Sequence, residues 1–300
     1  MEEMSAVEGQ VVDQEALAAW IAGLPVDGAV PSWVHPTEPG YPYDEAAALW
    51  LSWAAWRGVA VPDALVDTLR GALVSGGLGR AGQRYVFDSC LAVHALARAG
   101  VPFELDAALA TLERCTEVVH PVRRPDHWSE RWTGHLARGA ALLLQAARVT
   151  GSDRAARLAR SLRARATEPT QGYVHALAYA TEGELLFRAL GEPAGALDPR
   201  DVAATFAALQ HPDGTLPAWD DGREPTRLDA TAQAVRIWCV VDRKRHADAI
   251  DAALGALGRW QHPSGGMAYD PRGHVNSWAS MFADQAVGWA RDGVDGRGWI

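Results

Sequence analysis

The sequence predicts an all-α protein, an (α/α)6 toroid of six inner and six outer helices. The first observation is a repeat of long apolar segments, each of which begins at a polar or turn residue. Those first residues are Asp44, Asp88, Gly134, His175, Asp229 and Asn276, and they lie 44, 46, 41, 54 and 47 residues apart. A period of this size is typical of stacked helical units, and six units can close into a ring.

The second observation is a more polar helical segment before each apolar one. These segments carry arginine and aspartate on one face, which is typical of solvent-facing outer helices. Pro62, Ser152 and Pro199 lie at favourable helix starts, because proline suits the first turn and serine caps it. The outer helices are expected at residues 13–22, 62–74, 105–116, 153–167, 199–210 and 246–260.

The six apolar segments are predicted to form the inner helices. Four of them, 46–56, 91–99, 136–149 and 176–190, are apolar nearly all round, which indicates burial, and the last two begin at Asp229 and Asn276. No segment alternates with period two over several residues, so strands are expected to be absent or short.

The third observation is that the connections alternate in length. Those before inner helices are long and rich in Gly, Pro, His and Trp, the clearest being 33–42, 119–131, 211–227 and 262–275. Those after inner helices are short. Long loops on one rim of a scaffold are typical of a functional site, so a site is expected where the inner helices begin.

Composition limits the classes of function. Residues 13–300 are expected to form one toroid domain after a mobile tail of residues 1–12. The net charge of −9 without a long basic run argues against a nucleic-acid partner. Cys90, Cys115 and Cys239 lie in apolar helical stretches, which predicts reduced core thiols in a cytoplasmic protein. No window reaches the ~18 apolar residues that a membrane span needs.

Asp44, Asp88 and Asp229 are the candidate catalytic acids. Each opens an inner helix, where aspartate is also a favourable N-cap, so both interpretations stay open. Closure of the ring would bring the three carboxylates to one cavity. Carboxylates grouped in a partly dry pocket have their pKa values pushed apart, as acid and base roles require.

The fourth inner helix carries His175, Tyr179 and Glu182 on one face, since they lie four and three residues apart. A carboxylate on a helix that is buried all round must be paired or line a cavity. His175 is therefore a candidate for catalysis, with a hydrogen-bonded core histidine as the alternative.

Aromatic residues gather in the loops of the same rim. His127, Trp128, Glu130 and Trp132 precede the third inner helix. Tryptophan platforms beside polar groups suit sugar rings and equally suit a carbocation; a surface loop anchored by tryptophan is the alternative. The Trp-Asp-Asp-Gly run at 219–222 is a weak metal signal, and no metal or cofactor is expected.

Two duplicated turns, Gln210-His211-Pro212-Asp213-Gly214 and Gln261-His262-Pro263-Ser264-Gly265, together with the helix-opening acids, resemble α/α-toroid proteins. The stretches 87–89, 175–183 and 228–233 resemble the sugar-active branch, which holds six-hairpin glycosidases such as unsaturated glucuronyl hydrolases and the N-acylglucosamine epimerases. This resemblance implies an enzyme acting on a hexose or uronic-acid residue in the toroid mouth.

A second resemblance is to the class II terpene cyclases, whose D-x-D-D-T-A motif supplies a protonated aspartate. The stretch 227–232 keeps the central Asp229, while Arg227 and Ala230 stand in place of the flanking acids. The resemblance implies a cyclase or isomerase with Asp229 as the general acid.

The favoured expectation is a hydrolase, in which Asp88 and Asp229 act as acid and base or nucleophile while His175 and Asp44 orient the substrate. An epimerase would use His175 with His127 or His135 to move a C–H proton. A non-catalytic binding or scaffold protein is the third possibility. A small molecule or oligosaccharide is the expected partner. The expected substrate-binding residues are Trp128, Trp132, His127, Glu130, Tyr179, Glu182, Trp219, Gln233, Asn276 and Trp278.

Overall fold

The computed structural model describes residues 11–80, 83–117, 133–166, 170, 172–223, 225–270, 272–295 and 298–300. Residues 1–10 of the expected tail lie outside these ranges, as does the loop 118–132 with four of the expected substrate-binding residues.

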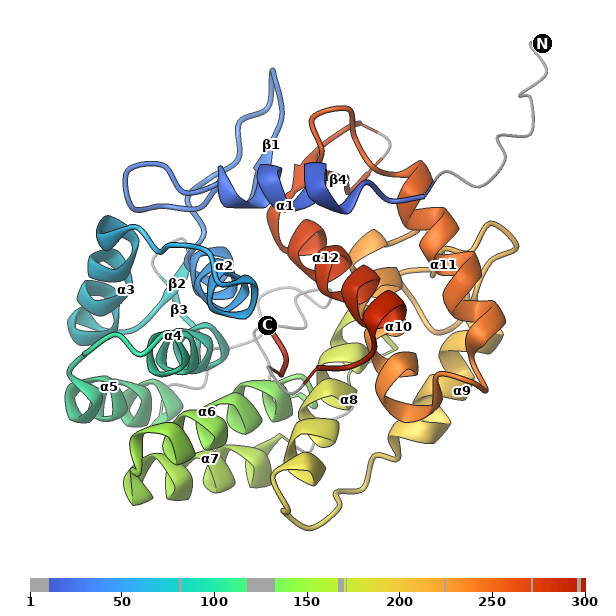
Figure 1. Ribbon diagram of the computed structural model, residues 1–300. Coiled ribbons are helices and arrows are strands. Elements are labelled where there is room, and N and C mark those ends of the chain that lie inside the picture. Colours follow the sequence, from blue (N-terminus) through green and yellow to red (C-terminus); the bar gives the residue numbers. More distant parts are fainter. Residues whose placement is uncertain are drawn as a thin grey trace.

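The described helices form a ring of inner and outer helices (Figure 1). The inner helices are α2 (Asp44–Arg57), α4 (Val86–Arg98), α6 (Leu136–Thr150), α8 (Val174–Ala189), α10 (Leu228–Asp242) and α12 (Ser277–Asp292). The outer helices are α1 (Gln14–Ala22), α3 (Asp63–Ser75), α5 (Leu105–Glu117), α7 (Asp153–Arg165), α9 (Pro199–Leu209) and α11 (Ala247–Arg259).

The ring closes between the first and last inner helices. Each inner helix packs against the next one in the sequence, α12 packs against α2, and each outer helix packs against an inner one. The (α/α)6 toroid predicted from the repeat is therefore confirmed. The predicted helices match the observed ones closely, except that α4 begins five residues before the expected position 91.

Two inner helices, α2 and α6, end at a glycine that begins a short connection. Gly58 after α2 and Gly151 after α6 both adopt the left-handed conformation, with φ of 71° and 70°. Glycine reaches this conformation without a steric penalty, and its N–H bonds back to the last turn. The chain thus turns at once into α3 and α7, whereas the connection from α8 to α9, residues 190–198, is longer.

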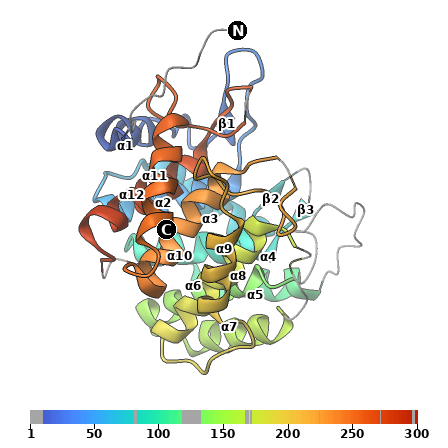
Figure 2. The same ribbon diagram turned by 90° about the vertical axis from the view of Figure 1, so that its right-hand side faces the viewer.

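Strands of two residues lie on the other rim, where the inner helices begin. β1 (Trp33–Val34), β5 (Val275–Asn276) and β4 (Met267–Ala268) form one antiparallel sheet in that order, and β2 (Gly79–Arg80) pairs with β3 (Gln83–Arg84). Trp33 lies opposite Asn276, so the sheet joins the first repeat to the last. Figure 2, a side view, shows β2 and β3 on one side of the ring and the C-terminal residues toward the other.

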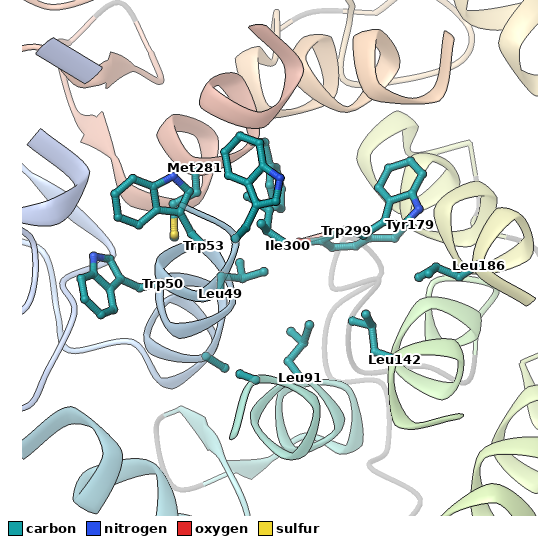
Figure 3. Close-up of a cluster of buried hydrophobic side chains, with 14 of the residues drawn as sticks. Leu49, Trp50, Trp53, Leu91, Leu142, Tyr179, Leu186, Met281, Trp299 and Ile300 are labelled. Atoms are coloured by element: carbon teal, nitrogen blue, oxygen red, sulfur yellow. The ribbon is translucent and has the colours of Figure 1, made fainter. Parts of the chain in front are cut away.

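The core fills the ring between the inner helices. Figure 3 shows Leu49 of α2, Leu91 of α4 and Leu142 of α6 directed toward one another, with Trp299 and Ile300 among them. All five side chains are at most 5 % exposed, so the centre of the ring is packed rather than open. Within the described part of the chain, no helix has the length and apolar character to cross a bilayer.

Candidate active site

A cavity of about 280 Å³ lies where the inner helices begin. The fold brings residues from all parts of the chain to it, because the N-terminal ends of the inner helices meet on one rim. The lining residues are Trp33, Tyr43, Glu45, Tyr85, Phe87, Asp88, Tyr173, His175, Arg227, Tyr269, Asn276 and Trp278.

Two carboxylates line this cavity. Glu45, the second residue of α2, accepts hydrogen bonds from the hydroxyl of Tyr43 and, at 3.1 Å, from the hydroxyl of Tyr179. Asp88 lies in the first turn of α4 and is 5 % exposed. Both acids lie in the first turn of an inner helix.

Asp44 lies elsewhere, although the sequence favours it as a cavity residue. Its carboxylate accepts a hydrogen bond from the N–H of Gly79 at 3.2 Å, which ties α2 to the start of β2. It is not among the residues that line the cavity, whereas the adjacent Glu45 is. Successive residues are rotated by about 100° around a helix, so a shift of one position changes which acid faces the cavity.

Asp229 is paired with arginine rather than exposed to the cavity. It is fully buried, and the Nε and Nη2 atoms of Arg227 donate to its two oxygens at 3.1 and 2.8 Å. The indole of Trp278 donates to it at 3.1 Å. Burial alone would raise the pKa of Asp229, but the charges of Arg227 and His175 and these hydrogen bonds outweigh it and hold the pKa well below its usual range.

Arg227 forms the wall of the cavity between two tyrosine rings. Its guanidinium carbon lies 4.5 Å from the ring centroid of Tyr269 and 5.4 Å from that of Tyr173. Such cation–π contacts hold the guanidinium in a fixed plane. Burial raises the pKa of Tyr173 to about 12, so its hydroxyl stays protonated and able to donate.

His175, the second residue of α8, connects the cavity with the buried polar residues behind it. Its Nδ1 atom lies 2.6 Å from Oε1 of Gln233 and 3.5 Å from Oδ2 of Asp229. Burial lowers the pKa of His175, and the nearby Asp229 carboxylate opposes this only in part. The imidazole is therefore neutral at neutral pH and can accept a proton.

His135, the other histidine expected for an epimerase, caps α6 and bonds to the hydroxyl of Thr133. Burial lowers its pKa to about 3, with a further contribution from the charge on His175. It packs against the ring of Phe87 and is not among the cavity residues. His127 lies outside the described residues.

Of the expected binding residues, Asn276 and Trp278 line the cavity. The Asn276 side chain also caps α12 by accepting from the N–H of Ala279. Trp219 lies beside the cavity wall, because its ring contacts that of Tyr173 at a centroid distance of 5.2 Å. Gln233 and Tyr179 are buried behind His175 and Glu45. Trp128, Trp132 and Glu130 lie outside the described residues.

Glu182 lies deeper in the ring, away from the cavity. Its carboxylate is fully buried between Arg138, whose Nε lies 3.0 Å away, and Arg236. Arg138 also donates to the carbonyl oxygen of Ile300. The paired guanidinium groups explain why the helix carries a buried acid, so the contacts of Glu182 are those of a structural ion cluster.

The sequence interpretation missed several cavity residues. Tyr43, Tyr85, Tyr173 and Arg227 immediately precede α2, α4, α8 and α10 as their N-cap residues. The repeat contains a signal for them, since each occupies the same position relative to an inner helix. Among the residues that the structure describes, no group of three or more His, Cys, Asp or Glu side chains could hold a metal ion.

No protein-family model matches the sequence, and no curated protein is significantly similar to it. Solved structures of similar shape include the unsaturated glucuronyl hydrolase of Streptococcus agalactiae (TM-score 0.62, 12 % identity), with 94 % of this chain and 93 % of that chain covered. An α-amylase from Clostridium perfringens has a TM-score of 0.61 at 11 % identity, with 93 % and 98 % covered.

A third similar structure is the type II terpene cyclase MstE from Scytonema. Its TM-score is 0.59 at 14 % identity, and the alignment covers 94 % of this chain and 97 % of that one. At these identities the likeness concerns the fold alone. The comparisons and the ring of helices agree that this chain is an α/α toroid.

Proposed function

We propose that the protein is a carbohydrate-active enzyme, a hydrolase that acts on a hexose or uronic-acid residue in the cavity. The observation that carries the proposal is the meeting of Glu45, Asp88 and His175 in one aromatic-lined pocket. Glycoside hydrolysis uses two carboxylates, and Glu45 with Asp88 form the pair in this cavity. The neutral imidazole of His175 supplies a third group that exchanges protons.

The other lining groups suit a sugar ring. Asn276 and Arg227 bring hydrogen-bonding groups to the wall, and Trp33 and Trp278 bring flat apolar faces. Sugars bind through this combination of convergent polar groups and stacking surfaces. Solved toroids of similar shape include a glucuronyl hydrolase and a polysaccharide lyase, which supports the carbohydrate class.

Asp229 has a different role in this proposal from the one expected from the sequence. A carboxylate held ionised by Arg227 has no proton to donate at neutral pH. Its contacts instead fix Arg227 and the His175 side of the cavity. The epimerase alternative keeps His175 as the base, but His135 is buried away from the cavity.

A cyclase of an apolar substrate is the second candidate, favoured by one observation. Seven of the twelve lining residues are aromatic, namely Trp33, Tyr43, Tyr85, Phe87, Tyr173, Tyr269 and Trp278. Aromatic faces stabilise cations, and a toroid of similar shape is a terpene cyclase. In that case one of the two lining carboxylates, Glu45 or Asp88, supplies the proton, because Asp229 is ionised.

A thermal-shift screen tests the proposal. One panel holds uronic acids, amino sugars and short oligosaccharides, and the other holds prenyl diphosphates and polyprenes. A ligand at a hundred times its Kd stabilises the folded state by about 2.7 kcal/mol, which raises Tm by several degrees. We expect a shift with a saccharide that changes in Asp88→Asn and not in the matched control Asp44→Asn.

The other outcomes are equally informative. A shift with the prenyl panel alone would contradict the hydrolase and favour the cyclase. A protein that responds to neither panel, with Asp88→Asn changing only the unliganded Tm, would favour a scaffold.

A further inference from the structure

A chain of buried polar contacts leads from the cavity to the centre of the ring. His175 Nδ1 lies 2.6 Å from Gln233 Oε1, and Gln233 Nε2 lies 3.4 Å from Glu182 Oε1. Glu182 in turn is held between Arg138 and Arg236. His175 is 5 % exposed and the other four residues are fully buried, so their polar atoms must find partners within the protein.

The two arginines determine how Glu182 bonds. A guanidinium group can only donate, so the carboxylate oxygens that face Arg138 and Arg236 accept, and Oε1 accepts from Nη2 of Arg236. The amide nitrogen of Gln233 must therefore point to Glu182, because the amide oxygen in its place would set two acceptors 3.4 Å apart. The orientation of the amide follows from the charge of its neighbours.

This orientation directs the amide oxygen of Gln233 at His175. An amide oxygen can only accept, so the proton between the two groups lies on Nδ1 of His175. The Asp229 carboxylate gives independent support, since its Oδ2 atom lies 3.5 Å from the same nitrogen and also accepts only. Nδ1 thus faces two acceptors, and in a neutral ring the lone pair belongs to Nε2.

We propose that Gln233 is a positioning residue, anchored by Glu182, that holds His175 in the tautomer with the proton on Nδ1 and the basic lone pair on Nε2. The lowered pKa of His175 supports this, because a neutral ring has a tautomer to select. The use of that lone pair to accept a proton from water or substrate rests on the proposed function, whereas the tautomer itself does not.

The test is nitrogen NMR of the full chain labelled in its histidines, since the ¹⁵N shifts distinguish a protonated from an unprotonated ring nitrogen. The ring signals of His175 are assigned as those that disappear from the spectrum of His175→Gln. We expect a protonated Nδ1 and an unprotonated Nε2 at neutral pH. In Gln233→Met, which keeps the length of the side chain but loses both polar groups, Nδ1 keeps only the Asp229 acceptor at 3.5 Å, so we expect part of the proton population to move to Nε2.

Gln285→Met is the matched control. Gln285 is a buried glutamine whose amide accepts from Arg236 at 3.2 Å and donates to the carbonyl oxygen of Gly298 at 3.1 Å. The Gln285→Met variant is expected to leave the His175 spectrum unchanged. It therefore distinguishes a general loss of stability from the specific loss of the group that positions His175. A proton on Nε2 in the wild type, or an unchanged tautomer in Gln233→Met, would overturn the proposal.

Activity provides a second readout once a substrate is known. Gln233→Met should lower kcat by about tenfold or more, a part of the ~10²–10⁴-fold that general base catalysis provides, with a much smaller effect on KM. An unchanged kcat in a variant whose tautomer is mixed would contradict the role of the His175 lone pair. If the spectrum shows a protonated Nδ1 but the protein turns over no saccharide, the proposed function is refuted. The assignment of the tautomer is then unaffected.

Discussion

At the scale of single residues, the acids at the helix starts differ through their immediate partners. Asp229 is held by Arg227, Glu45 by tyrosine hydroxyls, and Asp44 by a backbone N–H. A bidentate arginine keeps the carboxylate of Asp229 ionised. Three acids in similar positions along the sequence therefore have three different sets of contacts.

Replacement of Asp229 by asparagine should destabilise the protein. It leaves Arg227 buried without its counter-charge, and breaking a buried pair costs about 3–5 kcal/mol. The variant should also lower the pKa of His175 further, because the Asp229 charge raises that pKa. Urea unfolding and the pH dependence of kcat/KM measure the two effects. If Asp229→Asn is as stable as the wild type and the acidic limb of its kcat/KM pH profile does not move, the pairing of Asp229 with Arg227 and His175 does not have this effect.

Glu45 and Asp44 provide a matched pair of adjacent acids. Glu45→Gln should reduce kcat by about 10²-fold or more, because the cavity loses one of its two carboxylates. Asp44→Asn keeps an oxygen that accepts from Gly79 and should retain nearly full activity. Steady-state kinetics of both variants on the same saccharide compare them directly. Loss of activity in Asp44→Asn alone would restore the role that the sequence suggests for Asp44.

At the scale of helices, local pattern predicts where an element lies but not how it is rotated. The start of α2 follows from the sequence, since its acids and apolar run are contiguous. The choice between Asp44 and Glu45 depends on the packing of α2 against its neighbours, which no local pattern contains. The pairing of Glu182 with Arg138 and Arg236 cannot be predicted from local sequence either, because three different helices contribute the charges.

The contact between α6 and α8 makes a prediction at this scale. A Cβ atom added at Gly183 would lie 2.4 Å from the backbone of Ala137 and Arg138, so the helices can approach this closely only with glycine. Gly183→Ala should cost about 1–3 kcal/mol through overpacking. Gly71→Ala is the control on α3, where a Cβ meets no atom within 4 Å.

The control should gain about 0.5–1 kcal/mol, because alanine loses less conformational freedom than glycine in a helix. Chemical denaturation of both variants measures the difference. Equal stability of the two variants would contradict the close contact between α6 and α8.

At the scale of the whole molecule, buried neutral histidines make the stability depend on pH. Burial lowers the pKa of His94 and of His135 from the ordinary value of 6.5 to about 3. Between these values the unfolded chain binds protons that the folded chain does not, so stability falls as the pH falls from about 6.5 toward 3. Each histidine contributes up to about 1.4 kcal/mol per pH unit.

His94→Gln should flatten this dependence, because it removes one buried titrating ring and keeps a group that can bond to Gln145. The exposed His262 is the control, and His262→Gln should leave the slope unchanged. Urea unfolding between pH 4 and 7 provides the measurement. The same slope in His94→Gln and the wild type would contradict the assignment of His94 as a neutral buried group.

The ring itself follows from the sequence, because a period of 41–54 residues is visible without any structure. The cavity follows only in part. Asp88, His175, Asn276 and Trp278 line it as the helix starts suggest, and the N-cap residues share one position in the repeat, whereas the choice of Glu45 over Asp44 becomes visible only in three dimensions. Convergence on one rim is a property of the closed ring and not of any single repeat.

We propose that Glu45 and Asp88 catalyse sugar chemistry at this rim. The most direct measurement is mass spectrometry of a panel of uronic-acid-containing and neutral oligosaccharides after incubation with the wild type, Asp88→Asn and Glu45→Gln. We expect shortened products, each cleavage adding one water, with the wild type and none above background with either variant. Cleavage that persists in both variants, or a wild type that leaves every oligosaccharide of the panel uncleaved, would contradict this assignment.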